Sequence, residues 1–412
     1  MRIPSVGDLD GEPKSKLPRR DWILLPLLSL LTIFCILLGV ELSARELFTE
    51  SRPFLVSCMG PEDPSTGALA FPNSVCWDKK YESPWVEYRF NDCGHRTAID
   101  CRSAPTGVYR IVMTGSSVAM GHLVQQERTL AELLPINLSR RTNRKVELYN
   151  EGMVSIYPYV LALRFHEVVT AKPDVVLWIL TPGDIVKELI IPEAFKALGD
   201  SPISKAKARF AEAFSSTPSF DVISNLWTRA RGRVYRAASE TAFGTMLLHC
   251  LYASESQYVK SFLAGSDPDI GYVRVHQSEE WRNRLSHFDR DFATIQSQAK
   301  AAGIPLLTVL VPNRAQAAMI SVGHWPDDVD PYILNRELRD IVVTHGGTYL
   351  DIFSNFQHIP NPGEYYFPLD GHPNAAGHAL LANMLARSLT SGAVPPELRV
   401  RGKSPAEEQI RR

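Results

Sequence analysis

Hydroxyl, imidazole and carboxylate side chains stand in this sequence where a parallel sheet would bring them together. The stretch IVMTGSSVAMG (111–121) is an apolar run that ends in a glycine and two serines. Near the other end of the chain, YFPLDGHPNAAGH (366–378) has an aspartate and a histidine two positions apart. A nucleophilic serine needs a base, a group that orients this base, and hydrogen-bond donors for the oxyanion.

The sequence offers a candidate for each of these roles. Ser117 would be the nucleophile, His372 the base that takes its proton, and Asp370 the group that orients His372. The backbone N–H groups of Ser117 and Gly152 would bind the oxyanion, because a glycine lets the backbone approach closely.

Simpler interpretations exist for the same residues. Ser116 and Ser117 could cap the helix that follows them, and DGHPN (370–374) could be an ordinary turn. His378 is a second candidate for the base, although we prefer His372. His122 could contact a substrate or pack in a loop.

Five apolar runs bounded by turn residues predict the strands that position these side chains. They lack polar alternation, which is typical of a parallel sheet covered on both faces. In such sheets ligands bind beyond the carboxyl ends of the strands, where the candidate residues lie. The runs are 109–114, 146–150, 174–181, 305–311 and 347–353.

Amphipathic stripes between and after these runs predict helices. Apolar residues recur at spacings of three and four within 281–302, 334–342 and 381–389. Alternating strands and helices imply right-handed crossovers. We therefore expect an α/β fold, a three-layer α/β/α sandwich around a five-stranded parallel sheet.

The segment WILLPLLSLLTIFCILLGV (22–40) carries no charge and is long enough to cross a bilayer. Arg19 and Arg20 precede it and favour a cytoplasmic N-terminus. A cleaved signal peptide is the alternative, but Leu42 stands where cleavage before residue 45 would need a small residue. We expect a single-pass anchor in the cell inner membrane, with the catalytic domain on the periplasmic side.

Four of the six cysteines cluster just after this segment, which predicts two disulfides in an oxidising compartment. Their spacing does not fix the pairing, and Cys58–Cys76 with Cys93–Cys101 is our working hypothesis. A zinc site is the alternative, although no CxxC spacing is present.

The amino-acid composition is that of an ordinary folded protein. The 44 Lys and Arg nearly balance the 45 Asp and Glu, so no basic excess indicates nucleic acid as a partner. The basic stretch RARGRVYR (229–236) could face a membrane or serve packing. The predicted division is a cytoplasmic tail (1–21), a transmembrane helix (22–40), a Cys- and Pro-rich connector (41–105), an α/β domain (106–391) with a helical insertion (186–280), and a flexible tail (392–412).

The order of these segments resembles the SGNH, or GDSL-type, hydrolases over about residues 86–391, apart from the insertion. The resemblance implies a flavodoxin-like sheet, Ser117 as the nucleophile with Ser116 in place of the usual Asp, and Gly152 at the oxyanion. The two-residue spacing of Asp370 and His372 is also seen in relatives that acetylate alginate. The matching segments are VEYRFNDCGHRT (86–97), VMTGSSVAMG (112–121), VELYNEGM (146–153), KPDVVLWILTPGDI (172–185) and DGHPNAAGHALLA (370–382).

One departure concerns the oxyanion. The third segment of the family usually ends in Gly-x-Asn-Asp, and its Asn donates to the oxyanion, whereas this chain has Pro182-Gly183-Asp184. Loss of one such donor typically costs about 10²–10³ in rate. Gly183, Asp184, Asn313 and Arg314 are candidates for contacts with the substrate or the oxyanion, and the last two could instead belong to a solvated loop.

The expected protein is a membrane-anchored serine esterase that cleaves O-acyl esters, above all acetyl esters, of a carbohydrate or lipid. No metal or cofactor is implied, and no nucleic acid is expected as a partner. Two alternatives stay open at this point. The acyl group could pass to a hydroxyl of an envelope polysaccharide, or the chain could be a non-catalytic binding module on a degenerate hydrolase scaffold.

Overall fold

The computed structural model describes residues 18, 20–48, 55–60, 68–101, 106–187, 241–265, 269–391 and 395–399. The predicted tails at 1–17 and 400–412, and the part of the insertion at 188–240 with its basic stretch, lie outside the described residues. The domain boundaries therefore stay predictions at these places.

The core of the molecule is one parallel sheet of five strands, in the order β4-β3-β5-β6-β7. Each predicted apolar run contributes one strand, and every residue of β3, β5 and β6 is buried. This confirms the predicted α/β fold. The strands are β3 (Tyr109–Gly115), β4 (Val146–Asn150), β5 (Val175–Leu180), β6 (Leu306–Leu310) and β7 (Thr348–Tyr349).

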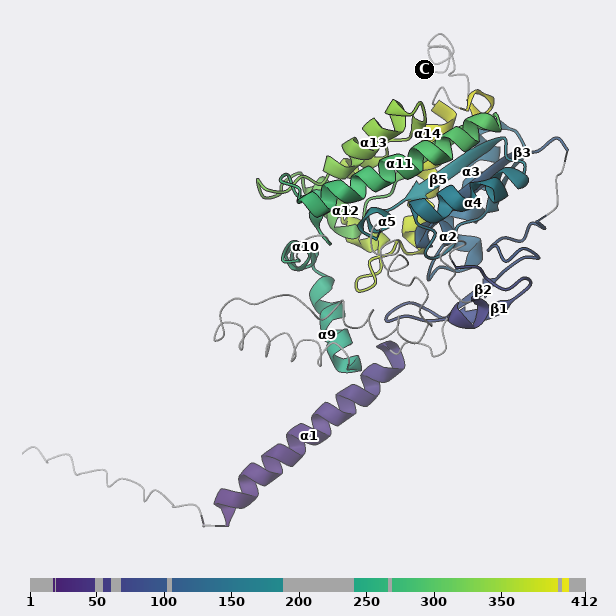
Figure 1. Ribbon diagram of the computed structural model, residues 1–412. Helices are drawn as coiled ribbons and strands as arrows, with labels where there is room; N and C mark the ends of the chain where they lie inside the picture. Colours follow the sequence, from purple (N-terminus) through teal and green to yellow (C-terminus); the bar gives the residue numbers. More distant parts are fainter. Residues whose placement is uncertain are drawn as a thin grey trace, which may run out of the picture.

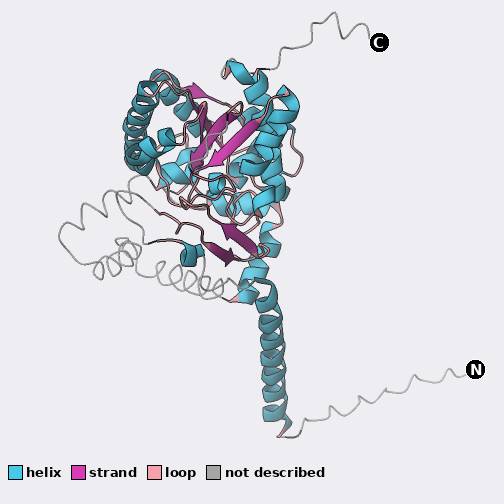
Figure 2. Cartoon of the chain, turned by 90° about the vertical axis from the view of Figure 1, so that its right-hand side faces the viewer, coloured by secondary structure: helices cyan, strands magenta, loops and turns pink. Residues whose placement is uncertain are grey.

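Helices cover both faces of this sheet, as Figure 2 shows. Helix α3 packs against α14, and α4 packs against α11. The stripes read from the sequence lie on α11, α13 and α14 and face the core. The bounds are α2 (Ser117–Met120), α3 (Leu130–Thr142), α4 (Pro158–Thr170), α5 (Pro182–Val186), α11 (Glu279–Ala301), α12 (Arg314–Val322), α13 (Ile333–Thr344) and α14 (Ala375–Ser391).

Short 3-10 helices complete the connections between these elements. They are η1 (Leu55–Cys58), η2 (Gln126–Arg128), η3 (Gly271–Val273), η4 (Phe353–His358), η5 (Pro362–Tyr365) and η6 (Pro396–Leu398).

Helix α1 (Asp21–Phe48) contains the predicted apolar segment and projects away from the sheet (Figures 1 and 2). Among the described residues it is the one helix long and apolar enough to cross a membrane, with a mean hydropathy of 2.8 over its best window. Its leucines, isoleucines and Trp22 are largely exposed.

Residues 68–101 do more than connect α1 to the sheet. They form an antiparallel hairpin of β1 (Val75–Asp78) and β2 (Val86–Arg89), and Val86 and Tyr88 belong to the same hydrophobic core as the sheet. The structure joins Cys58 to Cys76 and Cys93 to Cys101, so all four clustered cysteines are in disulfides. The part of the predicted connector from residue 68 on is therefore packed onto the α/β domain.

The buried guanidinium of Arg96 shows how closely this segment is joined to the domain. It donates to the carbonyl of Gly121, and to that of Val124 at 2.7 Å, just after α2. Its plane also lies 4.1 Å from the centre of the Tyr88 ring. The hairpin and the loop after α2 are thus held together by one charged side chain.

The described part of the insertion contains the α-helices α9 (Ala242–Tyr252) and α10 (Glu255–Leu263), followed by η3. Helix α9 packs beside the end of α1, where the carboxylate of Glu41 accepts the backbone N–H of Phe243 at 2.9 Å. Figure 1 shows α9 and α10 between α1 and the rest of the domain. The insertion therefore contacts both the apolar helix and the α/β domain.

Candidate active site

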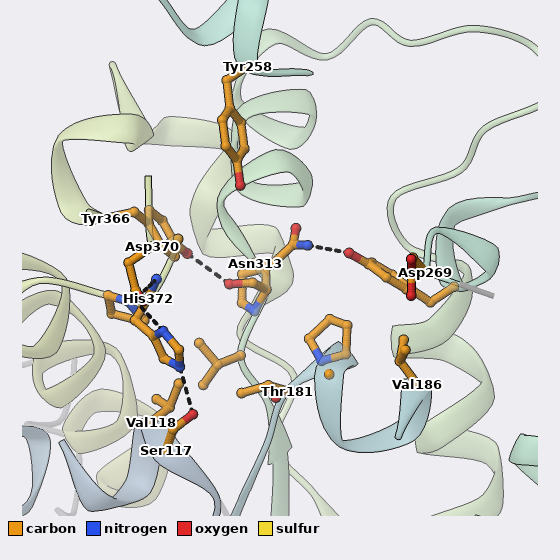
Figure 3. A pocket seen from close by; sticks show the side chains of 17 residues that line it. Ser117, Val118, Thr181, Val186, Tyr258, Asp269, Asn313, Tyr366, Asp370 and His372 are labelled. Carbon is orange, nitrogen blue, oxygen red and sulfur yellow. Dashed lines mark hydrogen bonds and ion pairs between the residues drawn. The ribbon is translucent and has the colours of Figure 1, made fainter. Parts of the chain in front are cut away.

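Ser117, His372 and Asp370 form one chain of hydrogen bonds at the carboxyl edge of the sheet (Figure 3). Ser117 Oγ lies 2.7 Å from His372 Nε2, and the His372 Nδ1–H donates to Asp370 Oδ1. Because an ionised carboxylate only accepts, the proton of the neutral ring belongs on Nδ1. The lone pair of Nε2 therefore faces the serine hydroxyl, which is the arrangement a general base requires.

A sharp turn from β3 into α2 brings Ser117 to this position. Gly115 has φ +136°, and a Cβ there would lie 2.2 Å from the carbonyl oxygen of Ile179. Ser116 is the residue before α2, and no side-chain hydrogen bond caps this helix. The hydroxyl of Ser116 bonds to Asp184 instead. The structure therefore does not support the interpretation that the side chains of the two serines cap the following helix.

The short spacing between Asp370 and His372 is accommodated by a tight turn at Gly371, whose φ is +79°. The N–H of Gly371 donates to the Phe367 carbonyl at 2.9 Å, and the N–H of Phe367 donates to the His372 carbonyl at 2.9 Å. Asp370 Oδ1 also accepts the backbone N–H of His372 at 3.3 Å. The stretch is thus a turn, and this turn aims the carboxylate at the imidazole.

The surroundings of Asp370 keep it ionised. Burial alone would raise the pKa of its carboxyl, but the hydrogen bond from His372 and the charges of His372 and Lys80 together hold the pKa well below its usual range. Lys80 Nζ lies 3.2 Å from Asp370 Oδ2. An ionised carboxylate at this place favours the imidazolium that forms when His372 takes a proton.

The other two candidate histidines are buried and engaged. The ring of His122 packs edge-on against His372 at 5.1 Å, and its Nδ1 lies 3.3 Å from the Tyr88 hydroxyl. His378 Nδ1 accepts the N–H of Leu130, the first residue of α3, at 3.0 Å. Burial lowers the pKa of each ring to about 3, so both stay neutral.

The N–H of Gly152, which the sequence suggests as an oxyanion donor, points to the side chain two residues before it. Its N–H donates to Asn150 Oδ1 at 3.0 Å, and it is not among the residues that line the pocket beside Ser117. A Cβ at this position would lie 2.6 Å from the backbone of Ala119 and Met120. The structure thus gives Gly152 a packing role against α2, where only a glycine fits.

The candidates after β5 also separate into two kinds. Gly183 lines the pocket, whereas Asp184 is buried behind it and accepts both the N–H of Thr181, at 2.7 Å, and its hydroxyl. Burial raises the pKa of Asp184, and its bonds to Ser116 and Thr181 oppose this rise. Asp184 therefore joins the turn after β5 to the nucleophile turn and does not reach the pocket.

The candidates after β6 divide in the same way. Asn313 lines the pocket, but its Oδ1 caps α12 by accepting the Gln316 N–H at 2.8 Å, and its Nδ2 donates to the Tyr272 hydroxyl. Arg314 is buried behind the pocket and donates to the Pro368 carbonyl at 2.7 Å. The expectation of a solvated loop is therefore wrong for Arg314.

A cavity of about 270 Å³ opens beside Ser117 and His372. Figure 3 shows the triad on one side of it and Val186 and Asp269 on the other. Several lining residues were not identified from the sequence, because they come from the insertion or from segments after it, and nothing in their spacing sets them apart. These are Val186, Tyr258, Asp269, Tyr272 and Tyr366.

Among the described residues, Asp92, Cys93 and Cys101 form one cluster whose side-chain donors are close enough to hold an ion. Its two sulfurs are bonded to each other, so it offers no thiolate. The zinc alternative therefore has no support at these cysteines.

No protein-family model matches the chain, and no curated protein matches it. Among solved structures, the chain is similar to TesA (9% identity, TM-score 0.36, 70% of this chain and 99% of that chain). It is also similar to the lipase/acylhydrolase from Enterococcus faecalis (12% identity, TM-score 0.36, 72% and 98%). A third is a GDSL-like lipase from Bacteroides thetaiotaomicron (10% identity, TM-score 0.32, 68% and 87%).

By their descriptions, two of these similar structures are a lipase/acylhydrolase and a GDSL-like lipase, the class that the sequence segments resemble.

The carboxyl of Glu151, next to Gly152, is a further unusual group near the nucleophile turn. It is 9% exposed, and burial, followed by the charge of Glu167, raises its pKa to about 8. The folded protein therefore holds a proton on Glu151 at pH 7, which the unfolded chain, with an ordinary carboxyl pKa near 4.5, releases.

This difference makes the stability of the protein depend on pH. Between pH 4.5 and 8 the folded state binds one more proton than the unfolded chain. The free energy of unfolding therefore falls as the pH rises through this range, by up to about 1.4 kcal/mol per pH unit. We expect Glu151→Gln to remove this loss. Its melting temperature relative to wild type should rise from pH 5 to about pH 8 and level off above that pH, as measured by thermal unfolding in detergent. Glu364→Gln, at an exposed position, is the control and should follow wild type. If the melting temperatures of Glu151→Gln and wild type change with pH in the same way, Glu151 does not have the raised pKa.

Proposed function

We propose that this protein is a serine hydrolase that cleaves carboxylic esters through an acyl-serine intermediate. The observation that carries the proposal is the Ser117–His372–Asp370 chain, with 2.7 Å between Ser117 Oγ and His372 Nε2. The buried residues around it are tied to the scaffold, so the three groups are held in place before a substrate arrives.

The reaction follows from these positions. His372 Nε2 takes the hydroxyl proton while Ser117 Oγ attacks the carbonyl carbon, and the ionised Asp370 stabilises the imidazolium. His372 then gives this proton to the leaving alcohol, which leaves an acyl group on Ser117. A water molecule, deprotonated by His372, attacks the acyl-serine, and His372 returns the proton to Ser117 Oγ as the acid leaves. The Ser117 N–H remains our candidate for an oxyanion donor.

The pocket supports a short acyl group on the substrate. Val118, Val186 and Val311 give it apolar walls, while Asn313 and Asp269 add polar groups. A cavity of about 270 Å³ accommodates an acetyl group with part of the alcohol that carries it. We therefore propose acetyl esters of a carbohydrate or lipid as the substrates.

The site is also proposed to lie outside the cytoplasm. Helix α1 has the length and the mean hydropathy of a membrane span, and the two disulfides belong to an oxidising compartment. We propose a single-pass anchor in the cell inner membrane with the hydrolase domain on the periplasmic side.

The catalytic proposal is tested with variants of the full chain in detergent, acting on a short-chain aryl ester. Ser117→Ala and His372→Ala should each lose about 10³-fold or more, and the double variant should lose no more than either, because the two residues act as one unit. Asp370→Ala should lose somewhat less.

Ser116→Ala is the matched control, since its hydroxyl bonds to Asp184 rather than to a catalytic group. It should retain most of the activity. Full activity of a folded Ser117→Ala variant, or additive losses in the double variant, would overturn the mechanism. An assay that also follows transfer of the acyl group to an added oligosaccharide separates hydrolysis from acyl transfer.

The localisation is tested with fusions placed after residue 391. A reporter that is active only outside the cytoplasm should be active there, because α1 would carry the following domain across the membrane. Activity of a cytoplasm-only reporter at the same position would refute the proposed topology.

A further inference from the structure

The loop between β1 and β2 contacts the loop that carries Asp370. Lys80 Nζ lies 3.2 Å from Asp370 Oδ2, and Glu82 Oε1 accepts the N–H of Leu369 at 2.9 Å. These two contacts join residues almost 290 positions apart. A segment that the sequence indicates as a connector thus reaches the residue that orients the base.

The two oxygens of Asp370 have different partners. Oδ1 accepts from His372, whereas Oδ2 faces the ammonium group of Lys80. The carboxylate side chain is 3% exposed and that of Lys80 is 28% exposed, so the lysine lies between the buried carboxylate and solvent. A carboxylate with both oxygens engaged is restricted to one rotamer.

We propose that Lys80 is a positioning residue of the active site, which holds the Asp370 carboxylate toward His372 and limits how strongly this carboxylate favours the imidazolium. This inference rests on the proposed serine hydrolase mechanism. A cation beside Asp370 repels the imidazolium that forms when His372 takes the serine proton, so Lys80 offsets part of the stabilisation that the carboxylate gives to this imidazolium.

Other titratable groups around the pair are either neutral or engaged elsewhere. Burial lowers the pKa of His122 to about 3 and raises that of Tyr88 to about 12, so both are neutral at pH 7. Further titratable groups near the triad are Glu82, Arg96 beside His122, Tyr258, Arg314 and His378, and across the pocket Asp269, Tyr272 and Tyr366.

Two hydrogen bonds within the loop do not involve the Lys80 side chain. The N–H of Ser83 donates to the Lys80 carbonyl at 2.9 Å, and the Lys80 N–H donates to the Ser83 hydroxyl at 2.9 Å. Both bonds use the backbone of Lys80. A substitution that removes the ammonium group therefore keeps these two bonds, although it also removes the contact of Lys80 Nζ with the Tyr81 ring at 5.4 Å.

The neighbouring Lys79 provides a matched control in the same loop. Its Nζ donates to the Leu47 carbonyl at the end of α1, at 2.9 Å, and to the Tyr81 carbonyl at 3.2 Å. It thus has the same charge and a similar degree of burial but points to the membrane helix rather than to the triad.

The test is the pH dependence of kcat/KM for the full chain in detergent, with a short-chain aryl ester between pH 5 and 9. We expect Lys80→Met to lower kcat/KM roughly 10-fold and to move the acid limb of the profile about 0.5–1 unit toward higher pH. Lys80→Arg should restore the wild-type limb, and Lys79→Met should leave it in place. Lys80→Gln is measured in parallel as a second neutral variant.

Each outcome decides the inference. An unmoved acid limb in both neutral variants, the same displacement in Lys79→Met, or failure of arginine to restore the limb would overturn it. Unfolding of both neutral variants would also overturn it, because Lys80 would then serve the fold. Ser117→Ala in the same assay separates the two proposals. If this variant keeps its activity, the hydrolase mechanism fails. If it is inactive but the acid limb of the neutral Lys80 variants is unmoved, only the role of Lys80 is refuted.

Discussion

The contact between Ser117 Oγ and His372 Nε2, at 2.7 Å, joins two residues that are 255 positions apart. It can form only if the end of β3 and the loop before α14 meet at the same edge of the sheet. The packing of α3 against α14 provides this, and the His378 ring fixes the two helices by accepting the N–H of Leu130. The histidine that competes for the role of base in the sequence thus helps to place the base itself.

Three charged side chains outside the triad support the same contact. Arg96 holds the loop after α2, Lys80 faces the second oxygen of Asp370, and Arg314 holds the Pro368 carbonyl beneath the triad loop. Arg314 also donates to the carbonyl of Tyr252, the last residue of α9. The hairpin and the insertion, which both contact α1, therefore reach the active site from two sides.

The sheet and the triad could be predicted from the sequence because both depend on local patterns. Apolar runs mark the strands, and the order of polar residues after them places Ser117, Asp370 and His372 at one edge. The hydrogen bond that occupies the Gly152 N–H, the burial of Arg314 and the reach of Lys80 could not be predicted in this way. The burial of Arg314 and the contact of Lys80 arise from packing between segments distant in sequence, which leaves no periodic signal in either segment. The Gly152 N–H bonds locally to the Asn150 side chain, and no pattern in the sequence marks which acceptor this N–H takes.

If Ser117 is a nucleophile activated by His372, a fluorophosphonate should label it covalently. The full chain in detergent is treated with a fluorophosphonate, digested, and the modified residue is mapped by mass spectrometry. We expect one adduct, on Ser117 and not on Ser116, which is absent in Ser117→Ala and strongly reduced in His372→Ala. An adduct on another residue, or no adduct on the folded wild-type protein, would contradict it.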